Sequence, residues 1–331
     1  MYNGIATCVD RMINPSRTKL NILVEPTHEA YQTLLGELGH NFYMIQGNGI
    51  KTWDFHTKPL PKNHFIINRP IEISFPLGIR IDLVLSQQRF GNLQRFADIA
   101  QKLGVPHVTI DHCLPPSNWT KTIINRTKEI PVDKRIFITE FSKTAWFGTD
   151  QDIILYHGIE PVQFSGWTGG SEAGISVVNK FASRDVFCGW NIWSEAAKKI
   201  PVELVGDNPG LSESAKSTDE LVSKLRKAKY FLNTSQWSPI PMSLVEAMMV
   251  GCPIITTRKQ EIPKFITHEV NGLFADTPEE IVAAAARISE NPEFAAQLGQ
   301  NARATALEYF GLDRFIKEWN IVLADAYRNF K

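Results

Sequence analysis

The chain has 331 residues, more than the ~250–300 residues at which a single hydrophobic core stops growing, so two domains are expected. Apolar residues make up 43% of the chain and charged residues 21%, which excludes a largely disordered protein. Lys plus Arg and Asp plus Glu number 35 each, so the chain has no overall charge that would attract nucleic acid or an anionic membrane.

Short apolar segments alternate with helical periodicity in the first half. The segments 20–26, 29–39 and 41–47 form a strand, a helix and a strand, which is one βαβ unit. Further strands are predicted at 79–87, 105–113 and 134–141, with a helix at 93–104. This alternation is typical of a parallel sheet that is covered by helices on both faces.

A second series of strands and helices begins at residue 173. Its elements are predicted at 173–181, 201–207, 218–228, 229–235, 244–251, 253–257, 271–275 and 278–291. We therefore expect an α/β protein with two Rossmann-like, doubly wound domains that face a central cleft. The predicted domains are 1–160 and 161–312, followed by a helix at 313–331 that packs back toward the first domain, and the stretch 157–170 is the predicted hinge.

The four cysteines are isolated from one another. Cys8, Cys113, Cys188 and Cys252 lack C-x-x-C spacing and histidine-rich neighbours, so neither a disulfide framework nor a zinc site is expected. The first residues lack the apolar core of a signal peptide, and no apolar run approaches the ~18 residues of a membrane span. We expect a cytoplasmic protein without a transmembrane segment.

The stretch "SQWSPIPMSLVEAMMVGCPIITT" places two prolines immediately before a helix. Prolines have no backbone donor and a restricted φ, so the N–H groups of Ile240, Met242 and Ser243 are left available for an anion. The N-terminus of a helix carries about half a positive charge and can therefore hold a phosphate. Ser243 and Glu246 also have the spacing of a capping box, which offers a purely structural interpretation of the glutamate.

This stretch resembles the nucleotide-sugar signature of retaining GT-B glycosyltransferases of the group 1, family 4-like type. In that family an acidic residue, a glycine-aromatic-glycine loop and a second glutamate precede a segment similar to "EAMMVGCPIITT". Residues 259–303 follow the family order of segments without a gap, and the resemblance covers about residues 170–330. In the first half the resemblance is weaker, and 152–164 is similar to the hinge passage of the family.

The resemblance implies roles for individual residues of the second domain. Glu246 stands where the second glutamate holds the ribose hydroxyls of the donor, and Ser238 stands where an acidic residue contacts the transferred sugar. A neutral hydroxyl cannot make that charge-assisted bond, so the identity of the sugar is not predicted. Lys180 and Arg184 stand for the basic pair that neutralises the diphosphate, although their spacing is shorter than usual. The candidate donor-binding residues are Glu246, Ser238, Ile240, Pro241, Met242, Ser243 and Asn208.

Three residues of the first domain follow predicted strands and are expected at the cleft. His112 resembles the active-centre histidine of the family, and we count it with Lys180 and Arg184 as a catalytic candidate. His28 and Arg89 are candidates for contacts with the acceptor. The Gly-rich loop that the family has after its first strand is missing here.

The resemblance implies a retaining glycosyltransferase that uses a nucleoside-diphosphate sugar and needs neither a cofactor nor a metal, since no D-x-D pair stands at a suitable strand end. The acceptor is a small molecule or a glycan. One alternative is a modified-DNA acceptor, for which the cluster Lys121, Arg126, Lys128, Lys134 and Arg135 is thin support, because a solvated face is the favoured interpretation of that cluster. Another alternative is an inactive nucleotide-sugar-binding module, because Ser238 replaces the acidic residue.

Overall fold

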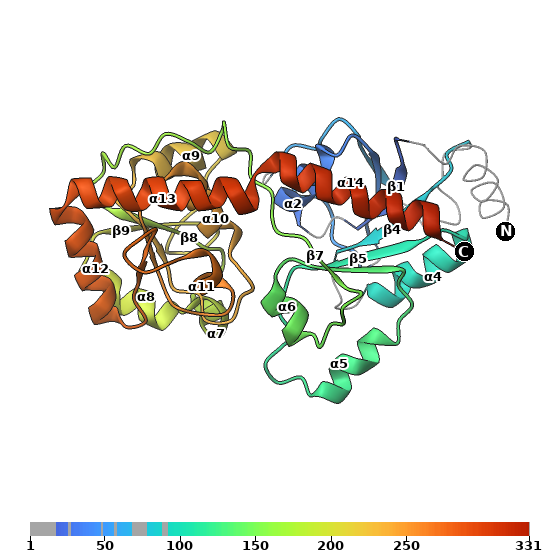
Figure 1. Cartoon of the computed structure of the whole chain (residues 1–331), viewed down its shortest axis with the longest axis horizontal. Coiled ribbons are helices and arrows are strands. Elements are labelled where there is room, and N and C mark those ends of the chain that lie inside the picture. The colour runs from blue at the N-terminus through green and yellow to red at the C-terminus, as the bar shows by residue number, and fades with distance from the viewer. Residues whose placement is uncertain are drawn as a thin grey trace. The chain divides into compact units, whose positions relative to one another are not determined.

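A computed structural model describes residues 18–25, 28–47, 49–55, 58–67, 78–87 and 92–330 of the chain (Figure 1). Contacts divide the chain into two compact units. Unit 1 contains the residues up to Tyr156 together with Phe315–Lys331, and unit 2 contains His157–Arg314. The divisions lie close to the predicted boundaries at residues 160 and 312.

Unit 1 is built on a seven-stranded parallel sheet with the order β3-β2-β1-β4-β5-β6-β7. The strands are β1 (Asn21–Val24), β2 (Asn41–Ile45), β3 (His64–Ile67), β4 (Leu83–Ser86), β5 (His107–Asp111), β6 (Lys134–Phe137) and β7 (Ile153–Ile154). This is the strand order of a Rossmann fold with one further strand at the edge.

The helices of unit 1 are α2 (Glu29–Gly36), α4 (Leu93–Leu103), α5 (Lys121–Lys128), α6 (Glu140–Ala145) and α14 (Leu312–Asn329). Parallel strands are joined by right-handed crossovers, so α2 lies on one face of the sheet and α4, α5 and α6 lie on the other. As the sequence predicts, α4 ends at Gly104, whose φ of 63° is in the left-handed region that glycine adopts without strain.

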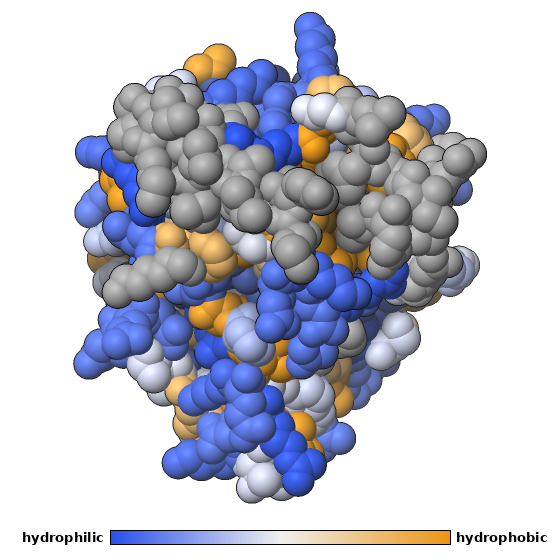
Figure 2. Space-filling model, turned by 90° about the vertical axis from the view of Figure 1, so that its right-hand side faces the viewer, coloured by the Kyte–Doolittle hydropathy of each residue, from blue (hydrophilic) through white to orange (hydrophobic). Residues whose placement is uncertain are grey.

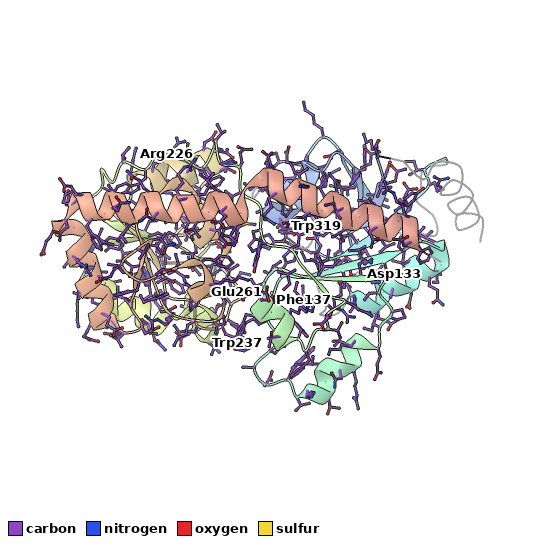
Figure 3. The ribbon with its side chains drawn as sticks, viewed as in Figure 1. Asp133, Phe137, Arg226, Trp237, Glu261 and Trp319 are labelled. Atoms are coloured by element: carbon purple, nitrogen blue, oxygen red, sulfur yellow. The ribbon has the colours of Figure 1, made fainter. Side chains whose placement is uncertain are left out.

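The last helix, α14, packs on unit 1 through aromatic side chains (Figure 3). The indole N–H of Trp319 donates to the hydroxyl oxygen of Tyr31 at 3.0 Å, and both side chains are buried. The ring of Phe315 meets the same tyrosine edge-on with the centroids 5.6 Å apart. The C-terminal segment is therefore part of the first unit although it follows the second in sequence.

Unit 2 contains a five-stranded parallel sheet with the order β12-β11-β10-β8-β9. Its strands are β8 (Gly174–Val177), β9 (Val202–Val205), β10 (Phe231–Asn233), β11 (Ile254–Thr256) and β12 (Leu273–Phe274). Its helices are η1 (Ala182–Arg184), α7 (Asp185–Cys188), α8 (Trp190–Ala197), α9 (Thr218–Lys227), α10 (Met242–Val250), α11 (Ile262–Phe265), α12 (Pro278–Glu290) and α13 (Pro292–Phe310). The prediction of two Rossmann-like α/β domains is confirmed.

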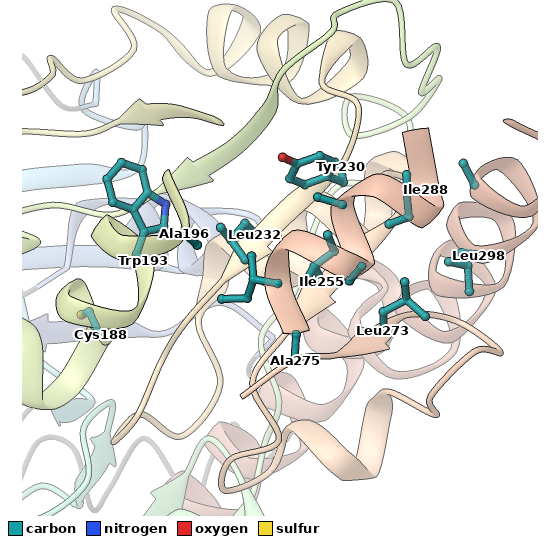
Figure 4. Packing of buried hydrophobic residues seen from close by; sticks show 14 of the residues in the cluster. Cys188, Trp193, Ala196, Tyr230, Leu232, Ile255, Leu273, Ala275, Ile288 and Leu298 are labelled. Atoms are coloured by element: carbon teal, nitrogen blue, oxygen red, sulfur yellow. The ribbon is translucent and has the colours of Figure 1, made fainter. Parts of the chain in front are cut away.

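The core of unit 2 forms where the central strands meet α8, α12 and α13 (Figure 4). Leu232 of β10 and Ile255 of β11 are almost completely buried against side chains that include Trp193 of α8 and Ile288 of α12. Burying one such aliphatic side chain stabilises the fold by about 1.5–3 kcal/mol. Elsewhere in the unit, Gly299 of α13 lies so close to the end of α10 that a Cβ would stand 2.0 Å from the Gly251 carbonyl oxygen.

Several predicted elements need correction. The strand predicted at 134–141 ends at Phe137, and Glu140 already belongs to α6, because Thr139 and Ser142 form a reciprocal capping box there. The sequence analysis did not predict the strands β3 and β7 or the helices α5, α6, α7, α8, α11 and α13. Among the described residues, no disulfide joins Cys113, Cys188 and Cys252.

The stretch 157–170, predicted as a hinge, is a folded part of unit 2. A guanidinium nitrogen of Arg303 donates to the Phe164 carbonyl at 2.6 Å, and one of Arg314 donates to the His157 carbonyl at 2.6 Å. The chain therefore passes from one unit to the other at Tyr156–His157 and not across the predicted stretch. Among the described helices, none is long and apolar enough to cross a membrane.

Buried histidines make the stability of unit 1 depend on pH. Burial is the main cause that lowers the pKa of His40, His64 and His107 to about 4, below the ~6.5 of an unfolded chain. The unfolded state then binds more protons between these values, so the free energy of unfolding is highest above about pH 6.5 and falls as the pH drops toward 4. We expect each histidine to cost about 2 kcal/mol at pH 5.

Denaturant unfolding at pH 7.5 and 5.0 measures this loss. His107→Gln removes one of these histidines. The free energy of unfolding should therefore fall by about 2 kcal/mol less between pH 7.5 and 5.0 than in the wild type. An equal pH dependence in wild type and His107→Gln would contradict the assignment.

Candidate functional site

The order of strands in unit 2 reverses beside β8, which has β9 on one side and β10 on the other. Ligands of open α/β sheets bind outside the carboxyl ends of the strands at such a switch point. The loops 178–181 and 234–241 leave the sheet from β8 and β10 at this edge. The candidate donor-binding residues Ser238, Ile240 and Pro241 all lie in the second of these loops.

The first turn of α10 lies at the end of β8. The hydroxyl of Ser243 donates to the carbonyl oxygen of Val177, the last residue of β8, at 3.0 Å. The N-cap of α10 is Pro241, whose extended backbone precedes the helix, and its side chain makes no capping bond. The predicted capping box of Ser243 and Glu246 is therefore wrong, because Ser243 lies inside the helix and its hydroxyl bonds to the sheet.

The backbone donors at this helix start are available to a ligand. Within the described part of the chain, the N–H groups of Ile240, Met242 and Ser243 donate to no carbonyl and no side chain. The next two N–H groups, those of Leu244 and Val245, both turn back to the Pro241 carbonyl. An uncapped helix N-terminus with unpaired donors is an anion-binding site of partial positive charge.

The two loops at the switch point are tied to each other. The N–H of Gln236, in the loop after β10, donates to the Phe187 carbonyl of α7 at 2.8 Å. Gly189 closes α7 with a φ of 75°, and a Cβ there would stand 2.1 Å from the Thr234 carbonyl oxygen. This close approach requires glycine and fixes the distance between the loops.

Asn208 ties a third loop, the one after β9, to the loop after β8. Its side-chain oxygen accepts from the Phe181 N–H at 2.7 Å, and its amide nitrogen donates to the Val178 carbonyl at 2.8 Å and to the Ser212 hydroxyl at 2.9 Å. The side chain of Asn208 is buried and its polar atoms are engaged in this way. The structure therefore gives it a scaffolding role, and direct contact with a donor stays a prediction.

The candidate cations Lys180 and Arg184 lie on the loop held by Asn208. Both side chains are exposed, and Lys180 has a φ of 52°, unusual for a residue with a side chain. Arg184 ends the short helix η1, and its guanidinium reaches the Asn179 carbonyl at 3.3 Å. Cys188 follows in α7, but burial raises the pKa of its thiol, so it is not a nucleophile at neutral pH.

Glu246 and Ser238 are both half-buried, Glu246 within α10 and Ser238 in the loop before it. Ile240 is only 3% exposed, so its side chain belongs to the core and its contribution to a ligand is its backbone N–H. Figure 3 marks Trp237, which precedes Ser238 in sequence, and Glu261, the N-cap residue of α11. The loop is also tied there, since the amide of Gln260 donates to the Gln236 carbonyl at 2.6 Å.

In unit 1 the strand order reverses beside β1, and two of the predicted residues meet at that edge. His28 caps α2 after β1, and His112 follows β5; the ring centroids are 5.7 Å apart. Gln87, which follows β4, accepts from His112 Nε2 at 3.3 Å and was missed by the sequence analysis. The sequence feature that could have identified Gln87 is a polar residue directly after an apolar strand. Arg89 lies outside the described residues.

The lysines of the basic cluster at residues 121–135 differ in their contacts. Lys134 pairs with Asp325 at 2.6 Å, while the ammonium groups of Lys121 and Lys128 lie over the ring of Phe147 at 5.2 and 5.8 Å. Figure 2 shows one side of the molecule, where hydrophobic residues are interspersed among hydrophilic ones. Among the described residues, no three His, Cys, Asp or Glu side chains gather to hold a metal ion.

Residues 213–305, which contain α10 and the loop before it, match the family model of glycosyl transferases group 1. The Bacillus subtilis (strain 168) protein named Putative glycosyltransferase YtcC is 30% identical over 108 residues. That similarity covers 31% of this chain and only 26% of YtcC, about a quarter of its length.

Solved structures resemble nearly the whole chain. Anabaena HepE in complex with UDP and glucose has a TM-score of 0.73 at 17% identity, covering 93% of this chain and 100% of HepE. Sucrose-phosphate synthase from Thermosynechococcus elongatus has a TM-score of 0.71 at 14% identity, covering 92% and 98%. The fold is therefore GT-B, and together with the family match it supports a GT-B glycosyltransferase.

The loop after β9 offers a test of how the site is supported. Gly206 has a φ of 140°, and a Cβ there would stand 2.2 Å from the Val178 carbonyl oxygen, whereas Gly210 in the same loop has a φ of 78° and open space around it. Gly206→Ala should lower the free energy of unfolding of unit 2 by more than about 2 kcal/mol. The control Gly210→Ala should cost only the ~1–2 kcal/mol of a left-handed alanine. Urea unfolding followed by circular dichroism compares the two, and equal losses would refute the close approach.

Proposed function

We propose that this protein is a retaining, metal-independent glycosyltransferase that moves a sugar from a nucleoside-diphosphate sugar to an acceptor hydroxyl. The observation that carries the proposal is the start of α10, where the unpaired N–H groups of Met242 and Ser243 lie at the switch point of unit 2. The family match that spans this segment supports it independently. Because HepE is described in complex with UDP and with UDP-glucose, a UDP-sugar is the donor to test first.

The reaction breaks the bond between the anomeric carbon and a phosphate oxygen, and negative charge builds on the departing diphosphate. Donors at the N-terminus of α10 and the cations Lys180 and Arg184 stabilise that charge without reorganisation. The acceptor oxygen bonds to the anomeric carbon on the face that the phosphate leaves. A phosphate oxygen takes the acceptor proton, so a separate general base is not needed.

The remaining candidate site residues are assigned to contacts with either the donor substrate or the acceptor substrate. Glu246, on α10, holds the ribose hydroxyls, and Ser238, in the preceding loop, contacts the transferred sugar through a neutral hydroxyl. In unit 1, His112 contacts the transferred sugar and His28 contacts the acceptor.

Incubation with UDP-, GDP- and ADP-sugars tests the proposal. We expect one donor to raise the melting temperature by mass action and to release free nucleoside diphosphate slowly without an acceptor. Release should continue in EDTA, because protein donors and cations stabilise the leaving group. Arg184→Ala serves as the control for contaminating hydrolases, since it should lower turnover more than affinity. Loss of turnover in EDTA with rescue by manganese would overturn metal independence, and binding without turnover would indicate the inactive module.

Glu246→Gln tests the ribose contact. The substitution keeps the shape of the side chain but removes charge-assisted bonds worth roughly 1.5–3 kcal/mol, so donor binding should weaken about 10- to 100-fold. The melting temperature should move by no more than a few degrees. Calorimetry measures the affinity, with Glu290→Gln, an exposed glutamate of α12, as the matched control. Wild-type affinity in a folded Glu246→Gln protein would exclude the role.

A further inference from the structure

Gln260, in the loop between β11 and α11, has a backbone conformation that a residue with a side chain seldom adopts. Its φ is 44°, which lies in the left-handed region where only glycine is free of strain. Any other residue there lowers the stability of the fold, because its Cβ lies too close to the following carbonyl oxygen. Strained residues of this kind persist where the surrounding contacts hold them, and they are typical of functional sites.

The side chain of Gln260 adds a second unfavourable feature. Its amide nitrogen donates to the Gln236 carbonyl at 2.6 Å, and since that carbonyl can only accept, the orientation of the amide is fixed. The side-chain oxygen of Gln260 is buried and accepts from no group in the part of the chain that the structure describes. A buried acceptor without a donor is unfavourable. Gln260 therefore lowers the stability of unit 2 in two ways while it makes one hydrogen bond.

That hydrogen bond joins two neighbouring loops at the carboxyl edge of the sheet. The strands β10 and β11 are adjacent, and the loops 234–241 and 257–261 follow them. Close to the sheet the loops are joined by Thr257, whose hydroxyl donates to the Ser235 carbonyl at 2.7 Å. Gln260 makes the next connection outward, to the carbonyl of Gln236.

The bond from Gln260 lies just before a part of the loop that has no hydrogen bonds of its own. The last paired N–H group is that of Trp237, which donates to the Phe187 carbonyl at 3.1 Å. Among the residues that the structure describes, 238–240 neither donate nor accept a hydrogen bond. The position of Ser238 therefore depends on how firmly the two residues before it are held.

The start of α10 is anchored separately from this part of the loop. The hydroxyl of Ser243 donates to the Val177 carbonyl at 3.0 Å and holds the first turn of the helix on β8. The N–H groups that we assign to the diphosphate should therefore keep their places when the bond of Gln260 is lost. The part of the loop around Ser238 should not.

We propose that Gln260 is a positioning residue for the sugar end of the donor, which holds the Gln236 carbonyl so that Ser238 meets the transferred sugar. The contact of Ser238 with the sugar rests on the proposed function, whereas the connection between the loops rests on the hydrogen bonds alone. A loop that is held in place before the ligand arrives loses less conformational freedom on binding, which raises the affinity. This role accounts for a residue that lowers the stability of its own unit.

Two substitutions separate the side chain of Gln260 from its backbone. Gln260→Ala removes the amide but keeps a Cβ in the left-handed conformation, whereas Gln260→Gly removes the amide and the strain together. Gln260→Gly should therefore melt roughly 2–8 °C above Gln260→Ala. Both variants should bind UDP-glucose about 3- to 10-fold more weakly than the wild type, the effect of one lost hydrogen bond, and calorimetry should find the affinity for UDP changed by less than about twofold.

Glu269→Gly is the matched control. Glu269 belongs to the same unit, has a φ of 64° and pairs with Arg287 at the surface, so its replacement should leave the affinities for UDP-glucose and UDP unchanged. An affinity for UDP-glucose that falls in Gln260→Ala but is restored in Gln260→Gly would mean that binding follows the strain and would overturn the proposal. Equal weakening of UDP and UDP-glucose would also overturn it, as would wild-type affinity for UDP-glucose in the folded glycine variant.

Hydrogen exchange tests the connection between the loops without a ligand. The N–H groups of Gln236 and Trp237 should exchange faster in both Gln260 variants than in the wild type, and unchanged exchange would overturn the positioning role. If the wild type binds a GDP- or ADP-sugar in place of UDP-glucose, the same comparison is made with that sugar nucleotide and its free nucleotide. Absence of binding to all three classes would reject the proposed function and the sugar contact with it, while the exchange rates still decide whether Gln260 holds the loop.

Discussion

The reversal of strand order in a parallel sheet decides where this protein can hold a ligand. Neighbouring loops diverge at the reversal, which opens space above the carboxyl ends of the strands. Both units have such a point, beside β8 in unit 2 and beside β1 in unit 1. The candidate cations and helix N-terminus lie at the first point, and the two paired histidines lie at the second.

At the switch point of unit 2, Ser243 anchors α10 to the sheet but does not cap the N-terminus of the helix. A capping serine would satisfy an N–H group of α10 and stabilise the helix by about 1 kcal/mol, but it would use a donor that an anion needs. Ser243 instead bonds to Val177 and docks the helix on the sheet. The uncapped start is therefore less stable than a capped one, a cost that a bound anion would offset.

Near the switch point of unit 1, hydrogen bonds between buried polar side chains hold the residues in one arrangement. Neutral amides and histidines in a core are unfavourable unless each is paired, and such networks specify one arrangement when every member is satisfied. The side chains of Asn63, His64, Gln32 and Gln87 are paired in this way, and backbone carbonyls accept from the amides of Asn63 and Gln87. The same burial that keeps the His64 ring neutral makes the unit sensitive to acid.

The sequence by itself determined the α/β class, most strands and the end of α10 at Gly251, because apolar runs, helical periodicity and a glycine in the left-handed region are local properties. It also indicated that the N–H groups of Ile240, Met242 and Ser243 are available, since proline chemistry is local. Only the tertiary structure decided that Ser243 bonds to Val177, 66 residues away in sequence, and that Gln87 lies between Gln32 and His112. Donor and acceptor partners far apart in the chain leave no periodic pattern, so their pairing emerges only when the strands take their order in the sheet.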